Sequence, residues 1–235
     1  MLDPAIRDQL STHFSSLNAR ITLALRPSAH PKQQELATLL EDLASLSGKL
    51  EVLESGASLD HLHFELLRDG MPLGIHFKGI PGGHEFTSLV LAILHADGKG
   101  RWPDEALKAR VMALRGPIHL RTFISLSCTN CPDVVQALNQ MALLHPDFSH
   151  TMVDGELHPD EVDRFGIQGV PAVFGDDALV HVGKAGFGEL LEALENRFGV
   201  RESASPAPVS TTEPWEVLVI GGGLAGAAAD TYSAR

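Results

Sequence analysis

Residues 118–132 have the sequence IHLRTFISLSCTNCP, and this stretch decides the fold. The apolar residues of 118–124 predict a strand, and Pro132 fits the first turn of a helix, where a missing amide hydrogen costs little. Cys128 and Cys131 therefore lie at a strand-to-helix turn, and the chain has no other cysteine. Two cysteines cannot form the disulfide framework of a small secreted protein, so the pair indicates catalytic thiols or half of a metal site.

The segments after this turn predict an alternation of helices and strands. We expect a helix at 132–144, a strand at 148–153, a short helix at 159–165, a hairpin at 172–182 and a last helix at 187–198. Together with the strand at 118–124, the order is β-α-β-α-β-β-α, which is the order of the thioredoxin fold. That fold places a cis-proline opposite its dithiol, and we expect Pro171, after Val170, to be this residue. A proline that only makes a turn is the alternative.

The first half of the chain predicts the same order without a thiol. Helices are expected at 3–17, 36–46 and 84–95, and strands at 21–25, 50–53, 61–68 and 71–78. Asp69-Gly70 favours a tight hairpin turn, because both residues tolerate a positive φ. The fold class is therefore α/β with two tandem thioredoxin-like domains, at 1–100 and 101–200, the second opened by a bridging helix near 104–114. The matching turn at 26–30 has no cysteine, so the first domain cannot exchange thiols.

The end of the chain predicts a third unit. Residues 201–214 are rich in Ser, Pro, Ala and Thr and are expected to form a linker. The apolar strand at 217–220 then leads into Gly221, Gly223 and Gly226, the start of a dinucleotide-binding domain over 215–235. The chain stops at Arg235, before the rest of such a domain, so we expect it to bind no FAD and to oxidise no NADH.

Composition and charge narrow the classes of partner. The formal net charge of -12 would repel nucleic acid and anionic lipid, so we expect protein or small-molecule partners and no membrane or nucleic-acid binding. No secretory signal and no apolar run long enough for a membrane span occur, which favours the cytoplasm.

The position of the dithiol predicts its chemistry. Free amides at a helix N-terminus stabilise a thiolate, so Cys128 is expected to be the nucleophile and Cys131 the resolving thiol. Zinc binding is the main alternative chemistry. The 12 histidines contain no His-x3-His pair and are expected to be scattered at surface or satisfied buried positions, so no metal site is assigned.

These features resemble the flavoprotein component of bacterial alkyl hydroperoxide reductase, an NADH-dependent peroxiredoxin reductase. The matching motifs are Gly-Gly-His-Glu-Phe at 82–86, Ser-Leu-Ser-Cys-Thr-Asn-Cys-Pro-Asp at 125–133 and the glycine-rich turn at 221–228. The resemblance implies that Cys128 and Cys131 reduce the disulfide of the peroxiredoxin component of that system, in peroxide detoxification. It also implies that electrons come from NADH through a reductase portion that holds FAD, and that the full-length protein forms a homodimer.

The resemblance further implies that Glu85 approaches the dithiol and tunes its protonation. From the residues alone, Glu85 could equally be a solvated carboxylate at a helix start. The sequence departs from the family at Thr129, where family members usually have His. The resemblance therefore does not fix the pKa of the thiolate or the reduction potential of the dithiol. Two other functions stay open: a general glutaredoxin-like or disulfide-isomerase-like oxidoreductase, and a docking module without enzymatic turnover.

Overall fold

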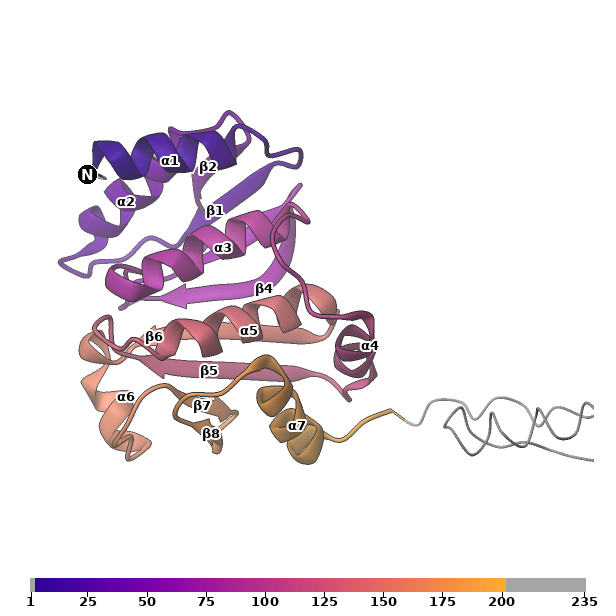
Figure 1. Ribbon diagram of the computed structural model, residues 1–235. Helices are drawn as coiled ribbons and strands as arrows, with labels where there is room; N and C mark the ends of the chain where they lie inside the picture. The colour runs from indigo at the N-terminus through magenta and orange to yellow at the C-terminus, as the bar shows by residue number, and fades with distance from the viewer. Residues whose placement is uncertain (1–2, 202–235) are drawn as a thin grey trace, which may run out of the picture. The chain divides into compact units, whose positions relative to one another are not determined.

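The computed structural model describes residues 3–201 and contains one mixed sheet with helices packed against it (Figure 1). The first half of this region holds four strands, three α-helices and a short 3-10 helix: α1 Pro4–Phe14, β1 Ile21–Leu25, α2 Gln33–Ala44, β2 Leu50–Glu54, β3 Phe64–Arg68, β4 Met71–Lys78, η1 Gly83–Glu85 and α3 Phe86–Ala96. The second half follows: α4 Glu105–Ala113, β5 Ile118–Ile124, α5 Cys131–Leu144, β6 Phe148–Asp154, η2 Gly155–Leu157, α6 Pro159–Arg164, β7 Ala172–Gly175, β8 Ala178–Val182 and α7 Phe187–Phe198.

The strand order places the C-terminal ends of β4 and β5 on the same side of the sheet, next to the C-terminal end of β6. The order is β2-β1-β3-β4-β6-β5-β7-β8, and both β4 and β5 pair in parallel with β6. Lys78 near the end of β4 and Phe123 near the end of β5 are both paired with Val153 of β6. The loops that leave β4 and β5 therefore start close together, although they belong to different halves of the chain.

Most of the helices pack on one face of the sheet, and α6 packs on the other. Helices α1, α2, α3, α5 and α7 all contribute buried residues to one large core, in which Phe14, Leu40, Ile93, Leu138 and Leu194 are at most 1% exposed. Helix α6 belongs to a smaller second cluster, where Val162 packs with Phe123 and Val153 from β5 and β6. Because successive strand residues point to opposite faces, α6 covers the face away from the large core.

The predicted tight turn at residues 69–70 and the helix start at Asp3 are confirmed, whereas one strand starts later than expected. Asp69 and Gly70 have φ values of 50° and 82°, as the hairpin turn between β3 and β4 requires. The Asp3 carboxylate accepts a hydrogen bond from the amide of Ala5 at 2.9 Å and so caps α1. The first hairpin strand begins at Phe64 and not at residue 61, although the His63 carbonyl still accepts the amide of Arg26 beyond the last strand pair.

The mixed α/β fold with thioredoxin-like order is confirmed, but the two halves are more closely joined than the tandem prediction suggested. Pairing of β4 with β6 merges them into one eight-stranded sheet. Division at residue 100 stays a prediction. The expected linker at 201–214 lies outside the described region except for Arg201, and the glycine-rich turn lies wholly outside it. Among residues 3–201, no helix has the length and apolar character needed to cross a membrane.

Candidate active site

Cys128 and Cys131 are disulfide-bonded at the expected strand-to-helix turn. Their Cα atoms are 5.6 Å apart, and Cys131 is the first residue of α5. The Cys131 amide donates a hydrogen bond to Sγ of Cys128 at 3.2 Å, and the Cys128 amide donates to the carbonyl of Ser125 at 2.9 Å. An amide at a helix N-terminus that points at sulfur stabilises negative charge there, so this turn favours a thiolate at Cys128 in the reduced state.

The two sulfurs differ in accessibility. Cys131 is completely buried, whereas Cys128 is half-buried. The Val170-Pro171 peptide bond is cis, as expected, and the Val170 carbonyl oxygen lies 3.8 Å from Sγ of Cys128. A partner sulfur can therefore reach Cys128 beside the Val170-Pro171 segment, while Cys131 is reached only from within the protein.

Glu85 is completely buried beside the loop that carries the dithiol, which excludes the alternative of a solvated carboxylate at a helix start. It ends η1, which packs against α5, and the neighbouring His84 amide donates to the carbonyl of Leu126 at 3.2 Å. Burial raises the pKa of Glu85 to about 7, and the nearby Ser88 hydroxyl opposes part of this rise. Neither carboxyl oxygen has a hydrogen-bond partner of good geometry, so a neutral, protonated Glu85 is readily populated near neutral pH.

The prediction of scattered histidines is wrong for one group. His61 lies within ring-contact distance of both His63 and His158, and His63 contacts His76 in the same way. His158 also lines a cavity of about 400 Å³ next to the ion pair of Lys78 with Glu161. No group of three or more His, Cys, Asp or Glu side chains between residues 3 and 201 is arranged to hold a metal ion. His61 and His63 precede β3 and His76 lies in β4, so the predicted hairpin could have indicated their contact. The approach of His158, which follows β6, gives no signal in the sequence.

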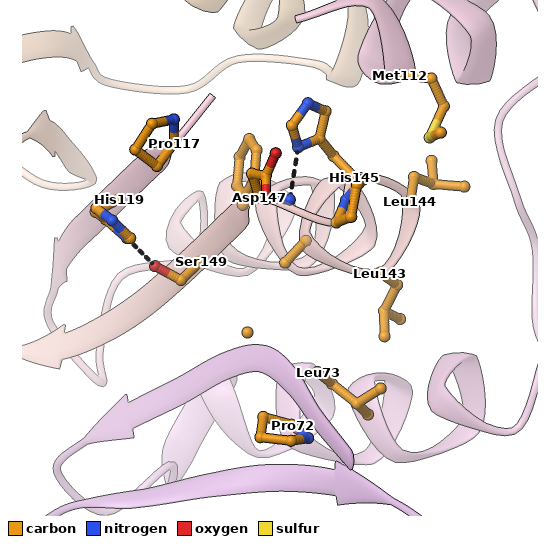
Figure 2. Close-up of a pocket in the computed structure, with 14 residues that line it drawn as sticks. Pro72, Leu73, Met112, Pro117, His119, Leu143, Leu144, His145, Asp147 and Ser149 are labelled. Atoms are coloured by element: carbon orange, nitrogen blue, oxygen red, sulfur yellow. Dashed lines mark hydrogen bonds between the residues drawn. The ribbon is translucent and has the colours of Figure 1, made fainter. Parts of the chain in front are cut away.

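Another cavity, of about 680 Å³, lies at the opposite end of the second half (Figure 2). It is bounded by Leu73 of β4, Leu143 near the end of α5, and His119, which is hydrogen-bonded to Ser149 at 2.7 Å. The dithiol follows the far end of β5, about 20 Å away for a seven-residue strand. This cavity is therefore remote from the exchange chemistry.

Comparison with known proteins agrees with this geometry. The thioredoxin domain model matches residues 119–195. The crystal structure of the NTD_N/C domain of alkylhydroperoxide reductase AhpF from Enterococcus faecalis superimposes with a TM-score of 0.77 at 31% identity, covering 83% of this chain and all of that one. The chain belongs to the AhpF family of alkyl hydroperoxide reductases. It corresponds to the N-terminal domain of that family, a thioredoxin-like domain with a redox-active C-x-x-C pair.

Longer relatives show how much of the family the chain covers. The alkyl hydroperoxide reductase AhpF of Pseudomonas putida is 38% identical over the whole of this chain, and a Bacillus subtilis protein named NADH dehydrogenase is 37% identical. The chain spans 45% of the length of each. A protein disulfide oxidoreductase from Aeropyrum pernix, with a TM-score of 0.73 at 20% identity, shares the fold; the match covers 86% of this chain and 96% of that one.

Four of the predicted site residues lie near the C-terminal ends of β4 and β5: Glu85, Cys128, Cys131 and Pro171. Gly221, Gly223 and Gly226, expected to hold FAD, lie outside the described residues. Thr129, the departure from the family, is in the loop between the two cysteines.

Proposed function

We propose that the chain delivers electrons from its dithiol to the disulfide of a peroxiredoxin, the peroxide-reducing component of the alkyl hydroperoxide reductase system. The observation that carries this proposal is the unequal pair of sulfurs, with half-buried Cys128 facing Val170 and buried Cys131 behind it. One accessible attacking thiol and one protected resolving thiol are the parts that directional exchange needs. Membership of the AhpF family supports the choice of partner.

The exchange proceeds in two balanced steps. The Cys128 thiolate attacks one sulfur of the partner disulfide, which forms a mixed disulfide and releases the other partner sulfur as a thiolate. Cys131 then loses its proton and attacks Sγ of Cys128, which restores the Cys128–Cys131 disulfide and releases the second partner thiol. Two electrons pass to the partner, and this chain needs an external reductant to repeat the cycle.

Glu85 is proposed to hold and release the proton that these steps require. A carboxyl group with a pKa of about 7 is present in both protonation states at neutral pH, which suits general acid-base chemistry. Its place beside the dithiol loop, fixed by the bond between His84 and Leu126, supports this role. The Val170-Pro171 segment is proposed to receive the backbone of the partner beside the sulfurs.

The remaining proposals concern the longer family members. We propose that the thioredoxin-like domains span 1–100 and 101–200, that 201–214 link them to a domain that begins at 215–235, and that Gly221, Gly223 and Gly226 there hold FAD. NADH would reduce that flavin domain, and the full-length protein would form a homodimer. The cytoplasm, which keeps thiols reduced, is the proposed compartment.

Electron transfer from the pre-reduced chain tests the function. Mixed in stopped flow with an oxidised bacterial peroxiredoxin, the chain is expected to reduce it quickly and to reduce insulin slowly, and the Cys128→Ser variant is expected to do neither. Equal rates on both substrates would instead indicate a general oxidoreductase. Absence of transfer to either substrate would leave a docking module as the better account.

A further inference from the structure

The backbone of the first half touches the dithiol loop at Gly83. This residue has a φ of 53°, and a Cβ built on it would lie 2.6 Å from the carbonyl oxygen of Leu126. Atoms do not approach so closely without displacement, and the obstacle is a backbone atom that cannot rotate away. Leu126 stands two residues before Cys128, and its carbonyl accepts the amide of His84, the residue after Gly83.

We propose that Gly83 is a positioning residue. Because it has no side chain, the turn η1, which carries Glu85 in the first half, can pack directly against the loop that precedes Cys128 in the second half. This inference rests on the proposed function, in which Glu85 handles the proton of the exchange. It explains what the thiol-less half contributes: a buried acid that one close backbone contact holds beside the loop preceding Cys128.

The burial of Glu85 depends on this closure. Glu85 lies two residues after Gly83 in η1, and η1 packs on α5, the helix that Cys131 starts. Desolvation is the main cause of its raised pKa, and no charged neighbour among the described residues contributes. Helices α3 and α5 both pack on η1. The titratable side chains on these three elements, besides Glu85, are exposed His84 on η1, buried His95 on α3, and buried Cys131 and exposed Asp133 on α5. A side chain at residue 83 would separate turn and loop, admit water and return the pKa of Glu85 toward its usual value.

The adjacent Gly82 provides a matched control. Its φ of -100° and ψ of -172° are extended backbone that any residue adopts, and a Cβ there would approach no atom closer than the Ile80 carbonyl oxygen at 4.0 Å. An alanine at residue 82 therefore adds the same methyl group one position away without opening the contact.

The test is the rate of Cys128 alkylation by iodoacetamide in the pre-reduced full chain as a function of pH. In the unmodified chain, the alkylation rate is expected to change in two steps with pH, one near pH 7 from Glu85 and one from the thiol itself. The Glu85→Gln variant is expected to lack the step near pH 7. Gly83→Ala should move this step to lower pH by at least about half a unit, because a less buried carboxyl ionises more easily. Gly82→Ala should leave the step in place, and Gly83→Ala should have no further effect on the profile when combined with Glu85→Gln.

Other outcomes would overturn the inference. They are an unchanged step in Gly83→Ala, an equal shift in Gly82→Ala, or a step that survives Glu85→Gln. Should Gly83→Ala fail to fold by circular dichroism, Gly83→Asn replaces it, since Asn tolerates the left-handed φ and still carries the Cβ. Failure of the proposed function is recognised separately, as a chain with the expected alkylation profiles that does not reduce the peroxiredoxin.

Discussion

His150 shows how a single buried residue couples this fold to pH. It is completely buried between strands and helix, where Nδ1 donates to the side-chain oxygen of Asn139 at 2.7 Å and Nε2 accepts the hydroxyl of Thr122 at 2.8 Å. Burial lowers its pKa to about 3, and burial also lowers the pKa of His63 and of His158 to about 4. All three are therefore neutral in the folded protein at neutral pH.

We predict that acid destabilises the protein well before its exposed carboxyl groups, whose usual pKa is about 4, are protonated. The unfolded histidines take up protons below about pH 6.5 while the folded ones do not, so the stability present at higher pH is lost as the pH falls toward the folded pKa. His150 alone contributes a slope of about 1.4 kcal/mol per pH unit in this range. Urea unfolding at a series of pH values from neutral down to mildly acidic measures the slope, which His150→Gln should reduce by about that amount. A slope equal to that of the unmodified chain would contradict the assignment.

Among single residues, the position of the cysteines follows from the local sequence, whereas the surroundings of Glu85 were implied only by the family resemblance. The apolar run at 118–124 predicts a strand and Pro132 predicts the first turn of a helix. Both features lie next to Cys128 and Cys131, so the local sequence was enough to place the cysteines at the turn. Carboxylates are rarely buried without a partner, so a single sequence favours the solvated state for any acid at a helix start. The burial of Glu85 arises from packing of η1 on α5, between segments that are distant in the sequence.

At the scale of elements, the hairpin of β3 and β4 depends on the conformation of Gly70. Gly70 has a φ of 82°, and no atom lies within 4 Å of a Cβ placed there. The cost of alanine is therefore purely conformational, and Gly70→Ala is expected to lower the free energy of unfolding by about 1 kcal/mol.

A helical glycine with equally open surroundings is the control. Gly188 in α7 also has no atom within 4 Å of a built Cβ, but its φ is not positive. Gly188→Ala should raise stability by up to about 1 kcal/mol. Chemical denaturation of both variants measures the difference, and a loss of similar size in both would show that turn geometry is not the cause.

The elements differ in how well the sequence predicts them. The spacing of apolar residues and the positions of turn residues predicted β1, the β3–β4 hairpin and α7 to within a few residues. These patterns lie within each segment itself. The pairing of β4 with β6 was missed, since the sequence of one strand does not say which distant strand lies beside it. The approach of His158 to His61 was missed for the same reason.

At the scale of the whole molecule, the seam between β4 and β6 makes the two halves one unit. Gly74 in β4 has a φ of 69°, and a Cβ there would lie 2.4 Å from the carbonyl oxygen of Phe148, at the start of β6. Only glycine allows the strands to approach so closely at this point. The shared sheet also places the turn that carries Glu85, in one half, against the loop that precedes Cys128 in the other.

We predict that the two halves unfold together. Amide hydrogen exchange in β1 and in β5 should lose protection at the same denaturant concentration, because the seam and the common core join them. Gly74→Ala should lower stability by about 2 kcal/mol or more, through strain at the seam. Loss of protection in β1 well before β5 in the unmodified chain would contradict a single cooperative unit.

In the proposed exchange, Cys128 attacks the partner disulfide and Cys131 resolves the mixed disulfide. The most direct measurement is trapping of the mixed disulfide: a reduced Cys131→Ser variant is mixed with oxidised peroxiredoxin, and the linked peptides are identified by mass spectrometry. We predict a stable complex joined through Cys128, and only weak trapping by Cys128→Ser, whose remaining thiol at Cys131 is buried. Equal or stronger trapping through Cys131 would contradict the claim.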